Sequence, residues 1–383
     1  MLIAYATAGN GHRSAAEAIA ESVRAAGRVA EMADVLDFTD PVFRLFYSDV
    51  YQMAGEHSHG ICGAMYRLTD ISPRNSSIVR IIDRISLNRT QPFADFIKKT
   101  APEAFIATHF LPMSIAARMK RHGQYGGPLF AVVTDYDLHH LWFSEEVDCY
   151  FAGGGEIVTR LTGMGVPPER IVVSGIPVRR KIAEASGGMA RSAGSSLSVL
   201  FLASSIADDK AAQIVDLLLS LPGKLNLKVI CGRNRSLLKT LEKHPLRGKD
   251  GFEVLGFTED IHHHYAEADL LVTKPGGLTV AEALCFGLPM IFVHPIPFQE
   301  TKNAEFIQKQ GGGWIVSDLF SLGRIVRLLS CERGLLVKAR TACSGIARPE
   351  AAETIVREVT RRTLRFAGCG FHAGSALQAT GTL

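Results

Sequence analysis

The chain has 383 residues, of which 47% are hydrophobic and 21% are charged. That length favours two domains, and that composition is typical of a globular chain rather than a disordered one. No segment reaches the roughly 18 apolar residues that a membrane-spanning helix needs. The seven cysteines are scattered without a C-x-x-C pair, which argues against a disulfide framework or a zinc site and favours reduced thiols in the cytosol.

The net charge of +4 is distributed unevenly. Residues 1–180 hold 18 Lys and Arg against 19 Asp and Glu, whereas residues 324–365 hold 10 against 4. This basic C-terminal region either binds an anionic lipid surface, at about 1 kcal/mol per well-placed residue, or is a solvated helix face. The chain has no recognisable nucleic-acid-binding module, so no nucleic-acid partner is expected.

The chain opens with an apolar run over residues 2–6, which predicts a buried strand. No charged or long apolar leader precedes it, so we expect no secretory signal peptide. A glycine-containing loop leads into a helix predicted over residues 14–26. His12 lies just before that helix, where an imidazole with a pKa of about 6.5 can accept a proton at neutral pH. His12 is a candidate general base, with helix capping and packing as the alternatives.

The region from residue 38 to residue 99 is different in character. Residues 38–53 are densely apolar and aromatic, and residues 76–89 place isoleucines on one side of a predicted helix and arginines elsewhere. This amphipathic helix either packs on the sheet of its own domain or lies on a lipid surface with its arginines at headgroup level.

Short apolar runs at residues 104–107, 129–133 and 149–152 alternate with helices predicted over residues 111–121 and 155–164. This βα alternation predicts a parallel sheet.

An Asp-x-Asp pattern, Asp135 and Asp137, follows the second of these strands, with His139 and His140 nearby. Such a cluster is one pattern for a divalent metal that binds a diphosphate. Because the pattern is short and common, and because a glycine turn elsewhere suits a diphosphate, we expect no metal here.

Residues 184–198 are small, polar and glycine-rich, which is typical of a linker. A second βα series follows, with strands predicted over residues 199–202 and 228–231 and a helix over residues 207–219 between them. Residues 253–258 read as a strand that ends in a turn.

Three consecutive histidines, residues 262–264, do not share one helix face, so we interpret them as exposed helix surface rather than a metal site. From residue 318 the chain is predicted to be helical to about residue 366, and the small, polar tail that follows is predicted to be disordered.

The most informative stretch begins with the buried strand predicted over residues 270–272. A Pro-Gly-Gly turn at residues 275–277 ends that strand, and a helix is predicted over residues 279–286. Glycines at a strand-to-helix turn let backbone amides approach an anion, and the helix N-terminus adds partial positive charge, which suits a diphosphate. Glu282, one turn into the helix, can accept hydrogen bonds from ribose hydroxyls. An ordinary βα connection is the alternative.

The next strand, over residues 290–293, leads into a loop that holds Gln299, Glu300 and Asn303. An adjacent amide and carboxylate at the carboxyl edge of a parallel sheet can grip sugar hydroxyls. Together, KPGGLT-x2-EAL-x2-GLP and PIP-x-QE-x2-NA-x-F resemble the donor half of inverting GT-B glycosyltransferases. They resemble especially the diacylglycerol glycosyltransferases, which include the plant monogalactosyldiacylglycerol synthases and the bacterial processive diacylglycerol β-glucosyltransferases.

The resemblance implies an α/β fold of two doubly wound parallel-sheet domains that face each other across a cleft. It implies an acceptor and membrane-facing domain over residues 1–180, a linker over 181–198 and a nucleotide-sugar donor domain over 199–345. A C-terminal helix over residues 346–366 would cross back to the first domain, and residues 367–383 would form a disordered tail.

For the donor, the resemblance implies a UDP-hexose whose base lies at Gly256, Phe257 and Thr258. The diphosphate would bind the amides of Gly276, Gly277 and Leu278, with Thr279 nearby. Glu282 would hold the ribose, and Gln299 and Glu300 would hold the sugar. The loop ASSIADD, at residues 203–209, lacks the glycine that the family has there, which leaves its contact with the diphosphate open.

For the acceptor, the resemblance implies that His12 in the G-x-G-H segment is the base, with Gly11 beside it. The string TD-x2-LH-x2-W-x-F resembles the acceptor-side loop of the family, so Asp135 is assigned to orient another group, with His12 as the candidate, and Trp142 to contact the acceptor or lipid. Phe43 and Phe46 are assigned to membrane contacts. Asp135 and Trp142 also have purely structural interpretations.

The implied reaction inverts the anomeric centre, gives a β-glycolipid from diacylglycerol or glycosyl-diacylglycerol, and requires no metal or other cofactor. Retaining relatives carry E-x7-E, whose first Glu would fall on Lys274. The implied location is the cytoplasmic face of an anionic membrane. The alternatives are an N-acetylglucosamine transferase for another lipid-linked acceptor of the peptidoglycan type, a UDP-sugar 2-epimerase, and a non-catalytic membrane sensor of UDP-sugars. Glucose, galactose, glucuronate and N-acetylglucosamine remain open as the sugar.

Overall fold

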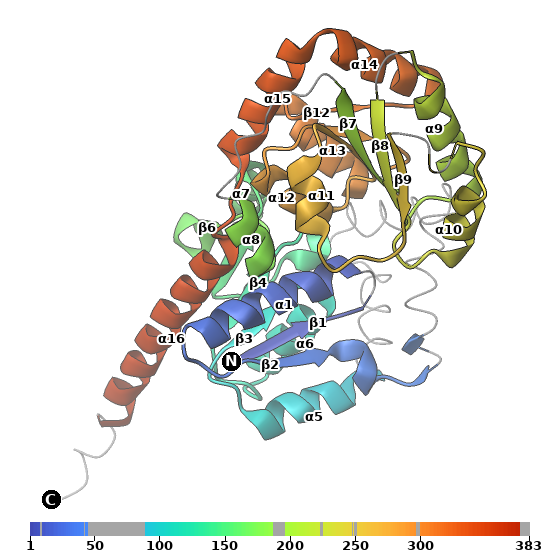
Figure 1. The fold of residues 1–383 in the computed structure, drawn as a ribbon. Coiled ribbons are helices and arrows are strands. Elements are labelled where there is room, and N and C mark those ends of the chain that lie inside the picture. The colour runs from blue at the N-terminus through green and yellow to red at the C-terminus, as the bar shows by residue number, and fades with distance from the viewer. Residues whose placement is uncertain are drawn as a thin grey trace, which may run out of the picture. The chain divides into compact units, whose positions relative to one another are not determined.

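The computed structural model describes residues 1–7, 10–41, 43–44, 89–186, 196–222, 225–246, 248, 251–295 and 299–375. The chain divides into two compact units, the first formed by Met1–Arg180 and Glu350–Leu383 and the second by Lys181–Pro349. Each unit contains a six-stranded parallel sheet with helices on its faces (Figure 1). Within these described ranges, no helix is both long enough and apolar enough to cross a membrane.

The sheet of the first unit has the strand order β2-β1-β3-β4-β5-β6, and all its neighbouring strands are parallel. Its strands are β1 (Leu2–Tyr5), β2 (Glu31–Asp34), β3 (Phe105–Ala107), β4 (Leu129–Val132), β5 (Cys149–Ala152) and β6 (Ile171–Val173). The central strands are buried on both faces, which is why they are almost continuously apolar in the sequence.

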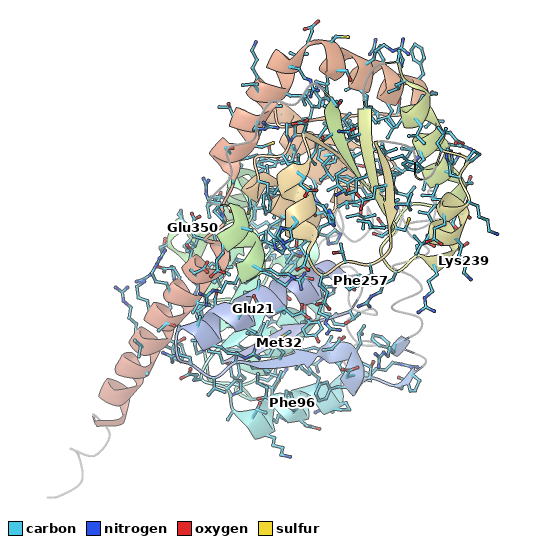
Figure 2. All side chains as sticks on the ribbon, in the orientation of Figure 1. Glu21, Met32, Phe96, Lys239, Phe257 and Glu350 are labelled. Carbon is cyan, nitrogen blue, oxygen red and sulfur yellow. The ribbon has the colours of Figure 1, made fainter. Side chains whose placement is uncertain are left out.

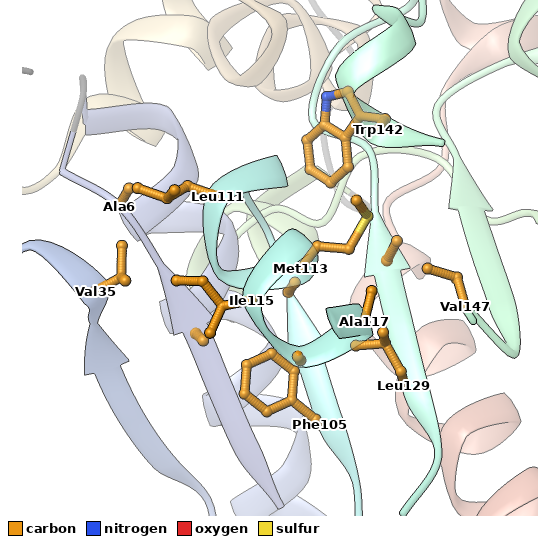
Figure 3. Close-up of a cluster of buried hydrophobic side chains, with 14 of the residues drawn as sticks. Ala6, Val35, Phe105, Leu111, Met113, Ile115, Ala117, Leu129, Trp142 and Val147 are labelled. Carbon is orange, nitrogen blue, oxygen red and sulfur yellow. The ribbon is translucent and has the colours of Figure 1, made fainter. Parts of the chain in front are cut away.

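Helices cover both faces of this sheet. In β1, Leu2 and Ala4 point to one apolar cluster and Ile3 points to the other, as the alternation of a strand requires. The first cluster includes side chains of α5 (Gln91–Thr100), α6 (Phe110–Arg121) and α7 (Gly155–Gly163), and Figure 3 shows part of it around α6. The second cluster includes α1 (Asn10–Ala25) and α16 (Ala351–Ser375), which pack against each other. The end of the chain therefore returns to the first unit.

The sheet of the second unit has the order β12-β11-β10-β7-β8-β9, again parallel throughout. Its strands are β7 (Leu197–Leu202), β8 (Leu225–Ile230), β9 (Phe252–Leu255), β10 (Leu270–Thr273), β11 (Met290–Phe292) and β12 (Gly313–Ile315). The chain starts in the middle of the sheet, builds one side outward, and then returns to build the other side. This is the doubly wound order of nucleotide-binding folds.

The helices of the second unit also lie in two layers. One apolar cluster joins the sheet to α9 (Asp208–Ser220), α10 (Arg235–Glu242) and α14 (Leu319–Cys331). Helix α11 (Ile261–Glu267) contacts β7, and α12 (Gly277–Cys285) packs with α13 (Gln299–Lys309) and α15 (Arg333–Ile346). In Figure 1, α11 and α12 lie on the side of the sheet opposite to α9 and α10.

Three strands were missed by the sequence analysis, namely β2, β6 and β12, and all three are edge strands. Edge strands are short and partly exposed, and so they lack the apolar run that marks a central strand. Glu31, for example, is exposed at the start of β2, and all of β6 is at least partly exposed.

The helix boundaries also differ from the predictions in places. Helix α8 (Arg180–Ser186) occupies the beginning of the predicted linker, whose residues 187–195 lie outside the described residues. Helix α16 continues to Ser375, eight residues into the tail that was predicted to be disordered from residue 368, because no proline interrupts it. Residues 76–88, most of the predicted amphipathic helix, lie outside the described residues.

Candidate active site

Both sheets have a topological switch point, where successive connections leave toward opposite faces. In doubly wound folds, ligands bind outside the carboxyl ends of the strands at that point. In the first unit the switch point lies between β1 and β3, and in the second unit it lies between β7 and β10. The predicted base, His12, follows β1, and the predicted diphosphate turn follows β10. The predicted base of the first unit and the predicted diphosphate-binding turn of the second unit therefore each lie at the carboxyl edge of their own sheet, where ligands are expected.

His12 lies in the first turn of α1 and is 9% exposed. Its Nδ1 atom lies 2.8 Å from the backbone oxygen of Thr108, which follows β3, and 2.9 Å from Oγ1 of Thr134, which follows β4. The Thr108 hydroxyl in turn donates to the backbone oxygen of His12 across 2.9 Å. Three neighbouring strand ends thus hold this one imidazole.

These contacts determine which nitrogen of His12 can act as a base. A carbonyl oxygen can only accept a hydrogen bond, so Nδ1 must carry the proton and Nε2 must carry the lone pair. Burial lowers the pKa of His12 below its ordinary value, whereas the charge of Asp135 and the hydrogen bond to Thr108 act in the opposite direction. The neutral ring is therefore the stable form at neutral pH, as a general base requires.

A second buried histidine accompanies the first. The rings of His109 and His12 meet edge to face, with centroids 4.6 Å apart and an interplanar angle of 89°. His109 caps α6, because its Nδ1 accepts the amide of Leu111 at 3.0 Å. Burial, and then the charge of His12, lowers the pKa of His109 well below its ordinary value. Neither Thr108 nor His109 was singled out from the sequence, because their roles depend on pairing between strands far apart in the chain.

Asp135 and Asp137, the residues of the Asp-x-Asp pattern, have different surroundings. Asp135 is 6% exposed and acts electrostatically on His12. A Cβ atom at Gly153 would lie 2.8 Å from the backbone oxygen of Asp135, so only glycine lets β5 end this close to it. Asp137 instead accepts two hydrogen bonds of 2.9 Å from Nη1 of Arg160 on α7. The two carboxylates thus have separate functions in the first unit.

The remaining acceptor-side predictions need correction in two places. Trp142, labelled in Figure 3, is only 4% exposed, and Phe43 is only 9% exposed. Both belong to the apolar cluster of the first unit. The burial of both rings contradicts the predicted membrane contact, whereas the predicted contact of Trp142 with the acceptor stays a prediction. Gly11 lies next to His12 in the first turn of α1. Phe46 lies outside the described residues.

In the second unit, the Pro-Gly-Gly turn becomes the N-terminus of α12. Gly276 is the N-cap residue, and its own amide donates to the backbone oxygen of Lys274 at 3.0 Å. Gly277, Leu278 and Thr279 form the first turn, two residues earlier than the predicted start. The amides of a first turn have no acceptor within their own helix, and they point outward along its axis with partial positive charge. This geometry suits a phosphate group.

Glu282, the predicted ribose ligand, is 8% exposed on α12. One of its carboxylate oxygens accepts the hydroxyl of Tyr265, on α11, at 3.1 Å. Burial, followed by the nearby charge of Glu282, raises the pKa of Tyr265 well above its ordinary value, so this hydroxyl keeps its proton. Tyr265 was not singled out from the sequence, and it fixes the carboxylate in a defined orientation.

The predicted sugar-binding residues lie on a helix rather than a loop. Gln299 and Glu300 are the first two residues of α13. Asn303, which is fully buried one turn later, donates its side-chain amide to the backbone oxygen of Pro275 at 3.0 Å. The structure thus joins the two halves of the sequence motif directly.

The predicted base-binding turn follows β9, where Phe257 is 60% exposed (Figure 2). The guanidinium of Arg233 lies 5.0 Å from the centre of its ring, a cation–π contact. Thr258 uses its hydroxyl to accept the amide of Asp260 at 3.1 Å. A Cβ atom at Gly256 would lie 3.2 Å from the side chain of Leu238 on α10, so a larger residue would be tight there.

The loop after β7, which lacks the expected glycine, is accommodated by a glycine elsewhere. Gly232, after β8, has a φ of +57°, and a Cβ atom on it would lie 2.8 Å from Cβ of Ser204. Asn234 then donates to the carboxylate of Asp208 at 2.7 Å. The close approach of these two loops leaves no room for a side chain at residue 232.

His294 is the residue with unusual backbone geometry in this region. It follows β11 and has a φ of +45°, which is uncommon for a residue other than glycine. Burial lowers its pKa, and the charges of Lys210 and Lys274 lower it further. Lys210, which follows β7, and Lys274, which follows β10, thus bring positive charge near His294. In the described part of the chain, no group of three or more His, Cys, Asp or Glu residues is placed to hold a metal ion.

These features define a class. Two doubly wound units, with a buried histidine at one switch point and a glycine turn opening a helix at the other, are the arrangement of a two-domain GT-B protein. Solved structures support the same fold. Acinetobacter baumannii MurG matches with a TM-score of 0.63 and 18% identity, covering 94% of this chain and 99% of its own. The UDP complex of S. aureus MnaA matches with a TM-score of 0.60 and 14% identity, covering 94% and 96%. The predicted α/β fold of two doubly wound parallel-sheet domains is confirmed.

Family models and relatives indicate which kind of GT-B protein the chain resembles. The model of monogalactosyldiacylglycerol (MGDG) synthase matches residues 12–178, and that of the glycosyltransferase family 28 C-terminal domain matches residues 200–324. A processive diacylglycerol beta-glucosyltransferase of Bacillus mycoides (strain KBAB4) is 26% identical over 372 residues, which cover 93% of this chain and 92% of the relative. The protein of that name from Bacillus subtilis (strain 168) is 24% identical over 382 residues, 95% of each. The chain is a glycosyltransferase, and it is similar to the MGDG synthase model in its N-terminal part and to the family 28 C-terminal model in its C-terminal part.

Proposed function

We propose that this glycosyltransferase moves a hexose from a UDP-sugar to diacylglycerol, or to a glycosylated diacylglycerol, and forms a β-glycolipid. The observation that carries the proposal is the pairing of a buried, neutral His12 at one switch point with the open first turn of α12 at the other. Relatives named processive diacylglycerol beta-glucosyltransferase match this chain over nearly its whole length and over nearly the whole of their own length. This favours diacylglycerol as the acceptor.

The donor half would bind the nucleotide. The diphosphate would bind the first-turn amides of Gly277, Leu278 and Thr279, and the ribose would bind Glu282, which Tyr265 orients. Two structural neighbours are described as complexes with UDP, which supports a uridine nucleotide here. Gln299 and Glu300, at the start of α13, are the proposed ligands of the sugar hydroxyls.

The transfer itself is a single displacement. The acceptor hydroxyl loses its proton to Nε2 of His12 as its oxygen forms a bond to the anomeric carbon of the sugar. The bond between that carbon and the phosphate oxygen breaks, and UDP leaves with the electron pair. Because the attack comes from the side opposite to UDP, the anomeric centre is inverted. Lys274 stands where retaining relatives carry the first Glu of E-x7-E, which also favours inversion.

The proposed site requires no metal. The N-terminus of α12 would stabilise the negative charge that develops on the leaving UDP. Lys274 and Lys210 would add to the positive potential at this edge.

We also propose that the protein works as a peripheral protein on the cytoplasmic face of a membrane, with no nucleic-acid partner. The support lies in the second half of α16, where Leu364 is 63% exposed and Phe366 is 45% exposed. Arg357, Arg361 and Arg365 are exposed along the same helix. Apolar side chains next to arginines suit an interface with anionic lipid. Loss of co-flotation with anionic vesicles in a Leu364→Ser, Phe366→Ser variant, at unchanged activity on short-chain acceptors in detergent, would test this role.

The experiment for the transfer is product analysis with a panel of UDP-sugars and diacylglycerol in mixed micelles, with wild type beside His12→Ala. We expect a glycolipid from wild type, its loss in the variant, and retained UDP binding in both. UDP binding without any lipid product would refute the acceptor assignment. A polyprenyl-linked acceptor would then test the peptidoglycan-type alternative, and binding without turnover on every acceptor would favour a sensor.

A further inference from the structure

The contacts around His12 include one side chain with no assigned role, the hydroxyl of Thr134. We infer that Thr134 is a positioning residue that, with the backbone of Thr108, keeps the proton of His12 on Nδ1 and the lone pair on Nε2. The hydrogen-bond role of Thr134 rests on the distances around His12, whereas its effect on catalysis rests on the proposed function.

The geometry makes Nδ1 a shared donor. Its proton faces the backbone oxygen of Thr108 at 2.8 Å and Oγ1 of Thr134 at 2.9 Å. The carbonyl oxygen cannot donate, so the alternative tautomer would place the lone pair of Nδ1 against a lone pair of Thr108. The hydroxyl oxygen of Thr134 therefore acts as a second acceptor for the same N–H. The ring also cannot flip, because the flip would put a C–H group between two oxygens.

Burial makes this arrangement effective. Thr108 is fully buried and Thr134 is 5% exposed, so water does not compete for these contacts. A buried N–H group without an acceptor costs free energy, so the N–H group at Nδ1 of His12 is stabilised by its two oxygen acceptors. The two acceptors stabilise the imidazolium that forms once His12 takes the proton of the acceptor hydroxyl.

Two ionisable groups act on the ring as well. Asp135, which follows β4 together with Thr134, favours the charged ring, and the buried His109, which follows β3, lies edge-on to it. The hydroxyl of Thr134 adds stabilisation without charge, so removing it changes the basicity of His12 and leaves the net charge of the cluster unchanged.

The first test is spectroscopic and needs no activity. The full chain is labelled with ring-¹⁵N histidine, and the His12 signals are those missing from His12→Ala. We expect wild type to show a protonated Nδ1 and an unprotonated Nε2. Thr134→Val, which keeps the shape but removes the oxygen, should keep the tautomer that the Thr108 carbonyl imposes but shift the Nδ1 signal and lower the pKa of His12, and Thr134→Ser should restore the wild-type signals.

Thr108→Val is the matched control, because it removes a buried hydroxyl of the same cluster but keeps the backbone oxygen that Nδ1 contacts. It should leave the tautomer of His12 as in wild type. A wild-type ring with its proton on Nε2, or a Thr134→Val ring with unchanged signals and pKa, would overturn the inference.

The second test is kinetic. Loss of one hydrogen bond to the base should lower kcat about tenfold in Thr134→Val at unchanged KM for the UDP-sugar. The acid limb of the pH profile should move down by roughly half to one pH unit. A purely structural role would lower thermal stability but leave the limb in place, and that result would contradict the inference. If no glycolipid forms in wild type, the proposed function fails, whereas the ring signals still decide the role of Thr134.

Discussion

The side-chain amide of Asn303 donates to the backbone oxygen of Pro275 across 3.0 Å, and this bond joins α13 to the turn that opens α12. The two segments lie 28 residues apart in the sequence. Through this contact, the proposed sugar-binding residues Gln299 and Glu300 keep a defined position relative to the first-turn amides of α12. The donor half of the site is thus one connected piece of structure.

Replacement of Asn303 should therefore affect both stability and donor binding. Asn303 is fully buried, so Asn303→Ala leaves the oxygen of Pro275 without this donor and should cost about 1–3 kcal/mol of unfolding free energy. We also expect weaker UDP binding by calorimetry. Lys302→Ala, which removes an exposed pair with Glu305, is the control and should change neither quantity appreciably. UDP affinity equal to wild type in Asn303→Ala would show that the contact does not organise the donor site.

The rate of transfer should depend on the neutral form of His12. Burial lowers the pKa of His12 below about 6.5, so the rate should be constant around neutral pH and fall only on the acid side. His12→Ala should lose about 10²–10⁴-fold in kcat without a change in UDP affinity. A pH profile of kcat/KM checks the first statement, and an acid limb above pH 7 would disagree with it.

The buried histidines should also make the fold sensitive to acid. The pKa of His109 is lowered well below its ordinary value by burial and by His12. Between the folded and the unfolded pKa the unfolded chain binds more protons, so stability decreases as the pH falls below about 6.5 and increases as the pH rises. We expect the urea midpoint to decrease from pH 7.5 to pH 5.5.

The variant His109→Asn should show a smaller decrease, because asparagine can still cap α6 but does not titrate. His122→Asn, at the exposed end of the same helix, is the control and should follow wild type. The same pH dependence in His109→Asn and wild type would show that His109 is not the acid-sensitive group.

The Asp-x-Asp pattern should not behave as a metal site. Asp137 is paired with Arg160, so Asp137→Asn should cost about 1 kcal/mol of stability and leave the rate within a few-fold of wild type. Asp135→Asn should lower the rate more, because it removes the charge that acts on His12. Activity should survive dialysis against a chelator. A loss of activity with the chelator that a divalent ion restores would contradict the proposed metal-free mechanism.

Trp142 should act through packing. Since its ring is buried beside α6, Trp142→Ala should destabilise the first unit by about 3–5 kcal/mol. Trp142→Phe should be milder and should bind lipid vesicles as wild type does. A stable Trp142→Phe protein that no longer binds vesicles would restore the lipid-contact interpretation.

The fold was largely predictable because its central strands are buried on both faces and therefore appear as apolar runs, as in β4 and β10. The edge strands β2, β6 and β12 were not predictable, because a half-exposed strand of three or four residues has no clear apolar run. The start of α13 was mistaken for a loop because the Pro-rich segment before it suggests irregular structure.

The site was predictable only where one short segment carries the chemistry. His12 and the turn at residues 275–277 can be recognised from the sequence, because each has glycines next to a helix start. No local pattern marks Thr108, His109 and Tyr265, because each acts on a residue that another strand or helix supplies. The burial of Trp142 was not predictable, because a tryptophan in such a loop looks the same in sequence whether its ring points inward or outward.

The most direct test of the central claim is the anomeric configuration of the product, measured by NMR on the glycolipid that the full-length protein forms from an α-linked UDP-hexose and diacylglycerol. We expect a β-linkage from wild type and no product from a His12→Ala protein that still binds UDP. An α-linked product would exclude inversion, and undiminished transfer by His12→Ala would exclude His12 as the base.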